Sequence, residues 1–314
     1  IGYGNGYEVS YMNSGKMTNK GWEFRVDAVP FENRDWRVGF YFNIAHNENK
    51  ITEMPDNYTE ENYTFNNGEY AYRREEGRPM GSFYGYRYKG VCQNKDATYA
   101  RDADGNVMKD ISGNAIVMRN GTATIAPGDA LYEDINHDGV INQYDIVYLG
   151  NSNPRFTGGA GVNVSYKQFK LSAIFYGRYG QDVVNSTRLN NESMRGIDNQ
   201  STAVLRRWRN EGDQTDIPRA LYGEGYNTLG SDRFVEDASY LRLKSLSFNY
   251  RLPKKIIQRW GFSNIDVYVT GYNLFTWTKY TGQDPEVKTE NTYARDSATT
   301  PASIQLVAGF NLSF

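Results

Sequence analysis

Residues 303–314, at the end of the chain, constrain the fold more than any other stretch. They read SIQLVAGFNLSF, and alternate residues from Ile304 to Phe314 are apolar, whereas those between them are polar or small except Val307. Successive side chains of a strand point to opposite faces, so this pattern predicts one strand with an apolar and a polar face. Strands of soluble proteins usually have about 5–6 residues, and a tilted strand that crosses a bilayer needs about 9–11. The length therefore favours a membrane-crossing strand, with closure into a barrel supplying partners for both of its edges.

The composition is compatible with a transmembrane barrel and gives little material for catalysis. No stretch approaches the roughly 18 consecutive apolar residues of a membrane helix, but alternating strands escape a hydropathy average. The 26 Tyr, 15 Phe and 5 Trp suit aromatic girdles, and they would also suit a soluble carbohydrate-binding protein. The net charge of −2 indicates no nucleic-acid-binding surface. One cysteine, Cys92, excludes an internal disulfide, and two histidines, His46 and His137, predict that the chain is not an enzyme.

Alternating apolar segments recur along the chain and predict an all-β fold. Residues 1–18 are rich in Gly, Asn and Ser and predict a loop. The apolar parity switches near Lys244 and Ser245, which predicts a β-bulge. A helix is expected around 203–209, and one helical turn after Pro253. Nine strands are predicted, at 20–29, 36–44, 68–75, 80–90, 158–166, 169–179, 238–252, 265–278 and 303–314.

The connections between these strands alternate between long and short. The long ones are residues 47–66, 92–157, 180–235 and 279–302, and the short ones are 30–34, 76–79, 167–168 and 253–262. Outer-membrane barrels sort their connections in this way, with long loops outside and tight turns on the periplasmic side. A β-sandwich has no reason to do so. We therefore predict a transmembrane antiparallel β-barrel, with further strands preceding residue 1.

Residues 134–145 have the spacing of a calcium-binding loop. Gly139 permits the sharp turn at the sixth position, and Asp replaces the usual closing Glu, which resembles dockerin-type loops. The predicted oxygen ligands of a structural Ca²⁺ are Asp134, Asn136, Asp138, the carbonyl of Val140, Asn142 and Asp145. The competing interpretation is a polar Asx/Gly turn. A second acidic run, residues 101–113, is better explained as a hairpin turn at its Asp-Gly step.

Several stretches together resemble the SusC/RagA family of TonB-dependent outer-membrane transporters. The Asn-Pro-Arg segment at 153–155 and the segment from Gly271 to the Asp-Pro-Glu at 284–286 are the most specific. The matching stretches run in family order, at 19–24, 81–91, 128–145, 149–185, 206–220, 238–250, 267–287 and 309–314.

The resemblance implies a 22-stranded, plugged barrel in the outer membrane of a Bacteroidetes-like host. It further implies active import of oligosaccharides or peptides, energised by TonB-ExbB-ExbD, with a SusD-like surface lipoprotein as a lid and a dimer of transporter–lipoprotein pairs. Signal peptide, plug and TonB box are not found in residues 1–314, so we interpret them as the C-terminal part of the barrel domain. No residue can be assigned to substrate binding. The alternative function is a soluble secreted β-sandwich that binds carbohydrate and carries a dockerin-like calcium loop.

Overall fold

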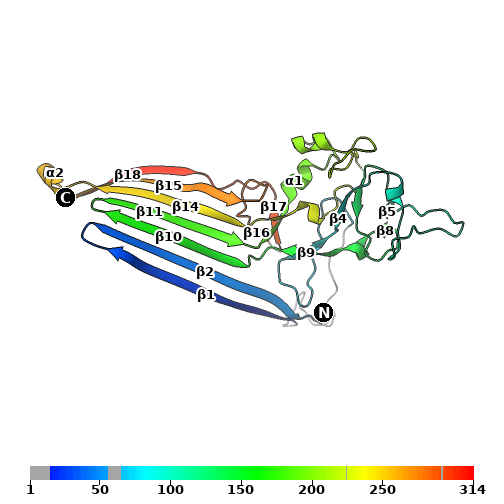
Figure 1. Cartoon of the computed structure of the whole chain (residues 1–314), viewed down its shortest axis with the longest axis horizontal. Helices are drawn as coiled ribbons and strands as arrows, with labels where there is room; N and C mark the ends of the chain where they lie inside the picture. Colours follow the sequence, from blue (N-terminus) through cyan, green and yellow to red (C-terminus); the bar gives the residue numbers. More distant parts are fainter. Residues whose placement is uncertain (1–14, 56–64, 224, 291–292) are drawn as a thin grey trace, which may run out of the picture.

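The chain forms a long antiparallel sheet with an irregular lobe at one end of its strands (Figure 1). The computed structural model describes residues 15–55, 65–223, 225–290 and 293–314. The predicted loop 1–18 therefore lies mostly outside the described residues. No helix among the described residues is both long and apolar enough to cross a bilayer.

The sheet has seven strands, and every neighbouring pair is antiparallel. In sheet order they are β1 (Lys16–Glu32), β2 (Trp36–Glu53), β10 (Phe156–Tyr166), β11 (Phe169–Tyr179), β14 (Tyr240–Arg251), β15 (Asn264–Thr278) and β18 (Gln305–Ser313). Short turns join β1 to β2, β10 to β11 and β14 to β15. The turn between β14 and β15 carries α2 (Lys254–Ile257), as predicted after Pro253, and η6 (Gln258–Trp260), at the end of the sheet away from the lobe (Figure 1).

The register confirms that the alternating residues separate onto two faces. One row across five strands is apolar throughout, and it consists of Phe42, Ala160, Phe175, Leu243 and Phe275. A row on the other face is polar from β10 to β15, and it consists of Asn163, Ser172, Ser247 and Thr270. The predicted last strand is confirmed as β18, which pairs with β15 from Gln305 to Ser313.

The bulge predicted from the parity switch is present in β14. The pairing with β15 shifts between Leu243 and Ser245, and the pairing with β11 shifts between Ile174 and Phe175. An extra residue at this point keeps apolar side chains on the same face along the whole of β14.

Two of the nine predicted strands are wrong, because residues 68–90 do not join the sheet. Residues 82–85 form β3 and pair with β9, and residues 88–91 form β4 and pair with β7. Tyr84 and Tyr86 alternate as they would in a barrel strand, but both are buried in the core of the lobe. The first strand also begins earlier than predicted, at Lys16, and the helix expected at 203–209 is the 3₁₀ helix η4 (Thr202–Arg206).

The lobe is built mainly from the insertions between β2 and β10 and between β11 and β14. Its largest apolar core includes Tyr84, Tyr86, Tyr132 and Ile141, all nearly or fully buried. Its remaining elements are β3 (Ser82–Gly85), β4 (Tyr88–Val91), η2 (Asp96–Thr98), β5 (Arg119–Asn120), β6 (Ala123–Thr124), β7 (Ala130–Tyr132), β8 (Val140–Ile141), η3 (Gln143–Asp145), β9 (Val147–Asn151), β12 (Asp182–Asn185), α1 (Ser186–Asn191), η5 (Asp232–Phe234), β13 (Val235–Asp237), β16 (Thr289–Glu290) and β17 (Tyr293–Asp296).

Candidate functional site

The two faces of the sheet expose very different chemistry. On the apolar face the side chains of Trp22, Phe40 and Phe310 are 49%, 40% and 67% exposed. Monomeric soluble proteins rarely expose contiguous apolar patches of more than a few hundred Å². The outward side of a membrane barrel presents such a band to lipid, while the inward side is polar.

The polar face carries an ion cluster near the lobe, centred on Arg242 of β14. Arg242 is only 2% exposed, and its guanidinium donates to the carboxylates of Asp284 and Glu286. Lys244, two residues along the same face, donates to Glu286 at 2.9 Å. Both carboxylates belong to the segment that follows β15. This segment is thereby held against the polar face of β14.

The environment of Asp284 favours its ionised form. Burial opposes the charge, but backbone N–H groups of Ala302 and Glu286 and the Arg242 guanidinium together hold the pKa of Asp284 below its ordinary value. Cations also lie over tyrosine rings here. The Arg242 guanidinium is 5.3 Å from the ring centroid of Tyr240. This end of the polar face therefore combines fixed charges with aromatic surface.

One salt bridge and two hydrogen bonds of Asn227 tie the insertions of the lobe to each other. Arg219, from the second insertion, donates to both carboxylate oxygens of Asp129, from the first, at 2.8 and 3.1 Å. Asn227 donates to the same carboxylate at 3.3 Å and accepts from the backbone N–H of Ala130 at 2.8 Å. Asp129 is 5% exposed, so these bonds compensate for the removal of its charge from water.

A chain of salt bridges within the second insertion of the lobe ends at Glu236, which contacts the segment that follows β15. Arg233 donates to Glu192 at 2.7 Å, and Arg188 bridges Glu192 at 3.0 Å and Glu236 at 3.2 Å. Thr281 donates through its hydroxyl to Glu236 at 2.8 Å. The segment after β15 is therefore fastened at two places, to β14 and to β13.

The six predicted calcium ligands lie in one loop of the lobe. Asp134 accepts the backbone N–H of Gly139 at 2.8 Å, and Asp138 accepts that of Val140 at 2.8 Å. Asn142 caps η3 by accepting the N–H of Tyr144 at 2.9 Å. These are bonds that either an Asx/Gly turn or a cation-binding loop would form.

Asp145 is the most constrained member of this loop. It is fully buried and accepts the backbone N–H groups of Ile135 and Asn142, both at 2.8 Å. Burial raises its pKa, and the nearby carboxylates of Asp134 and Asp138 raise it further. Each carboxylate oxygen of Asp145 thus accepts one backbone N–H group, and the described residues contain no group of three or more His, Cys, Asp or Glu side chains arranged around one metal position.

The second acidic run forms two turns, and the first of them is the hairpin turn predicted at its Asp-Gly step. Asp102 accepts the backbone N–H groups of Asp104 and Asn106 at 3.0 and 2.8 Å. Asp110 repeats this arrangement with Ser112 and Asn114, at 2.8 and 2.9 Å. The carboxylates of these two turns are thus used to close the backbone.

No local sequence pattern marks Arg242 as part of a cluster, since its acceptors lie more than forty residues away in a connecting segment. Two sequence features relate to this ion cluster. The strand alternation places Arg242 and Lys244 on the polar face, and the Asp-Pro-Glu at 284–286 supplies the two carboxylates. His46 and Cys92 have structural roles. His46 Nδ1 lies 2.6 Å from the carbonyl of Arg155, and burial raises the pKa of the Cys92 thiol to about 11.

No protein-family model matches the chain, but curated proteins do. It is 32% identical over 296 residues to TonB-dependent receptor P3 of Formosa agariphila, a match that covers 91% of this chain and 27% of the receptor. It is 25% identical over 312 residues to TonB-dependent receptor SusC of Bacteroides thetaiotaomicron, covering 96% of this chain and 27% of SusC.

Solved structures agree in fold. A RagAB peptide transporter structure superposes with a TM-score of 0.68 at 26% identity, over 100% of this chain and 31% of that one. The RagAB importer in its 'open-open' state gives a TM-score of 0.67 at 25% identity, over 100% of this chain and 30% of that one. The chain belongs to the SusC/RagA family of TonB-dependent receptors.

As a SusC/RagA-type receptor, the protein is located in the outer membrane, and its sheet is part of an antiparallel transmembrane barrel. The apolar face of the sheet is the side that meets lipid. The chain spans only about three tenths of the length of the relatives it matches. The relatives are named as receptors and transporters and not as enzymes, which supports a non-enzymatic role.

Proposed function

We propose that the complete protein imports oligosaccharides or peptides across the outer membrane by TonB-dependent active transport. A sheet with one exposed apolar face, one polar face and a lobe beyond one end of the strands supports this proposal most strongly. A barrel wall needs these three features together, because lipid, the barrel interior and the external medium contact different parts of it. The exposed apolar face argues against the soluble sandwich.

The partners of the complete protein follow from its relatives. Import would require TonB-ExbB-ExbD to act on the plug, and a SusD-like lipoprotein would close the barrel on the outer side. The RagAB structures are described as a peptide transporter and importer, which supports peptides as one substrate class. The family resemblance also supports a dimer of transporter–lipoprotein pairs. In this chain, the lobe and the segment held by Arg242 would contact substrate or the lipoprotein.

Uptake by intact cells tests this function. Cells that carry the full-length protein are supplied with labelled peptides and labelled oligosaccharides, and a matched strain carries the protein without its TonB box. We expect accumulation of one substrate class in the first strain and loss of that accumulation in the second. Equal uptake by both strains, for every substrate supplied, would overturn the proposal.

We also propose that the loop 134–145 binds a structural Ca²⁺. Asp134, Asn136, Asp138, Asn142 and Asp145 would supply side-chain oxygens, and Val140 its carbonyl. The spacing of these oxygen-bearing residues around Gly139 supports this proposal, because it matches the ligand positions of a calcium-binding loop.

Terbium luminescence tests the calcium proposal, with exposed Tyr144 as the sensitiser within the loop. We expect Tb³⁺ emission that Ca²⁺ abolishes by competition, and no such emission in Asp138→Asn. Asp110→Asn, in an acidic turn of the same lobe, is the matched control and should leave emission unchanged. Emission that persists in Asp138→Asn would contradict the proposed site.

A further inference from the structure

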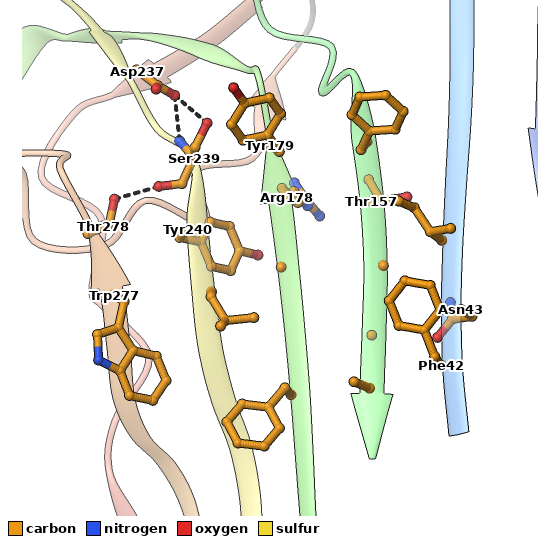
Figure 2. Close-up of a pocket in the computed structure, with 18 of the residues that line it drawn as sticks. Phe42, Asn43, Thr157, Arg178, Tyr179, Asp237, Ser239, Tyr240, Trp277 and Thr278 are labelled. Atoms are coloured by element: carbon orange, nitrogen blue, oxygen red, sulfur yellow. Dashed lines mark hydrogen bonds between the residues drawn. The ribbon is translucent and has the colours of Figure 1, made fainter. Parts of the chain in front are cut away.

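The apolar face of the sheet contains a groove at the end of the strands nearest the lobe (Figure 2). Its volume is about 680 Å³, within the range of roughly 300–1,000 Å³ typical of small-molecule sites. Small residues from β10 and β11, Gly158, Ala160 and Gly177, form its floor. Phe42 and Trp277 stand on opposite sides of it.

Close approach of the strands explains why the floor carries no large side chains. A Cβ atom at Gly158 would lie 2.5 Å from the carbonyl oxygen of Asn43 on β2. A Cβ atom at Gly177 would lie 2.7 Å from the carbonyl oxygen of Tyr240 on β14. Both positions therefore require glycine. The result is a strip of backbone without large side chains between Phe42 and Trp277.

The end of the groove nearest the lobe is polar. Ser239 donates through its backbone N–H to Asp237 at 2.8 Å, and Thr278 donates to the carbonyl of Ser239 at 2.8 Å (Figure 2). Asp237, Ser239 and Thr278 therefore form hydrogen bonds with one another. Lys279 also lines the groove, is exposed, and forms no ion pair with any residue in the described part of the chain. The Lys279 ammonium is therefore available where the apolar groove meets the polar rim.

We propose that this groove binds lipid A, the phosphorylated glycolipid of the outer leaflet. One acyl chain would lie along Gly158, Ala160 and Gly177, and a phosphate would contact the Lys279 ammonium. The protein lies in the outer membrane, so lipid covers this face. Aromatic and basic residues are typical of the level in a membrane at which acyl chains meet headgroups, and the groove has Phe42 and Trp277 at its sides and Lys279 at its rim. The choice of the outer leaflet rests on the proposed outward orientation of the lobe.

Lipid retention by the full-length protein tests the proposal. The protein is purified in mild detergent, and added lipid A competes with phosphatidylglycerol while native mass spectrometry counts bound lipids. We expect bound lipid A in the wild type, and about tenfold weaker binding in Ala160→Phe, which fills the floor, and in Lys279→Gln, which removes the cation.

Ala173→Phe is the matched control, because Ala173 is one of the small residues of the same face and does not line the groove. It should bind lipid A as the wild type does. Equal lipid A binding by all variants would overturn the proposal, and so would selective retention of phosphatidylglycerol. If Ala160→Phe does not fold, Lys279→Gln and the lipid competition decide. Uptake of nutrient is a separate readout, so failure here leaves the proposed import untouched.

Discussion

Two glycines on the polar face of the sheet lie directly under tyrosine rings of a neighbouring strand. Gly161 pairs with Tyr41, and a Cβ atom at Gly161 would lie 2.0 Å from that ring. Gly309 pairs with Tyr268, and a Cβ atom there would lie 2.6 Å from the tyrosine hydroxyl. Each ring therefore packs flat on backbone, which any larger residue would prevent.

Substitution of Gly309 should weaken the attachment of the last strand. Gly309→Ala forces the ring of Tyr268 away, and we expect a loss of about 1–3 kcal/mol in the free energy of unfolding, the usual range for overpacking. Urea unfolding of the folded protein in detergent measures it. Combining Gly309→Ala with Tyr268→Ala removes the clash, so the two losses should not add. Additive losses would show that the ring and the glycine act independently.

Arg242 should contribute far more than an exposed arginine of the same sheet. Arg242→Ala leaves Asp284 and Glu286 without this guanidinium, and breaking a buried pair costs about 3–5 kcal/mol. We expect faster hydrogen exchange in the segment after β15, measured by mass spectrometry. Arg25→Ala, which breaks an exposed pair with Asp27, is the control and should leave this exchange unchanged, because water screens exposed pairs. Unchanged exchange in Arg242→Ala would show that the segment is held by other contacts.

The same contact predicts a pH dependence. The folded pKa of Asp284 is lowered, so its stabilising effect is present above the unfolded pKa, about 3.9, and is lost as the pH falls through the folded value. Protection of the segment after β15, corrected for intrinsic exchange, should therefore decrease below about pH 4. Asp284→Asn should lack this decrease. An identical pH profile in wild type and Asp284→Asn would contradict the assignment.

At the scale of elements, residues 101–116 form two consecutive turns of eight residues each, RDADGNVM and KDISGNAI. Backbone N–H groups of Ala100, Met108 and Ile116 each donate to the carbonyl of another member of this trio, all at 2.9 Å. The repeat was visible in the sequence, but we interpreted the segment only as a single hairpin turn. A ring of three backbone hydrogen bonds holds the two turns together.

Each turn depends on one aspartate in the same way. Asp102→Ala and Asp110→Ala each remove a carboxylate oxygen that accepts two backbone N–H groups, and we expect each to lower the unfolding temperature of the lobe. Asp104→Ala is the control, because the exposed Asp104 contributes only its backbone N–H to this network. Thermal unfolding followed in the lobe measures all three. Equal effects at Asp102 and Asp104 would contradict this account.

The strands of the sheet were predictable because each must separate lipid from a polar interior along its whole length. Even the bulge near Ser245 left a change of parity in the sequence. The alternation at Tyr84 and Tyr86 led to a wrong prediction of a barrel strand. A short strand in the core of the lobe has the same period of two residues as a strand of the barrel. The contacts of Arg242 and Asp129 join residues far apart in the chain, and periodicity carries no information about them.

At the scale of the whole molecule, two long insertions build one lobe at a single end of the sheet, and the opposite end carries short turns (Figure 1). The insertions are tied to each other through Asp129 and Arg219, and to the strand ends through Glu236. The lobe, the strand ends and the segment held against β14 are therefore joined by one set of ionic contacts and hydrogen bonds.

The central claim is that this sheet is a barrel wall with lipid on one face. Single cysteines placed at 305, 306, 310 and 311 of β18, in the full-length protein in bilayers, are labelled with a fluorophore; Cys92 is buried and should stay unlabelled. We predict that a lipid-borne quencher acts on positions 306 and 310, and a water-soluble quencher on 305 and 311. Equal access of the water-soluble quencher to all four positions would contradict the claim.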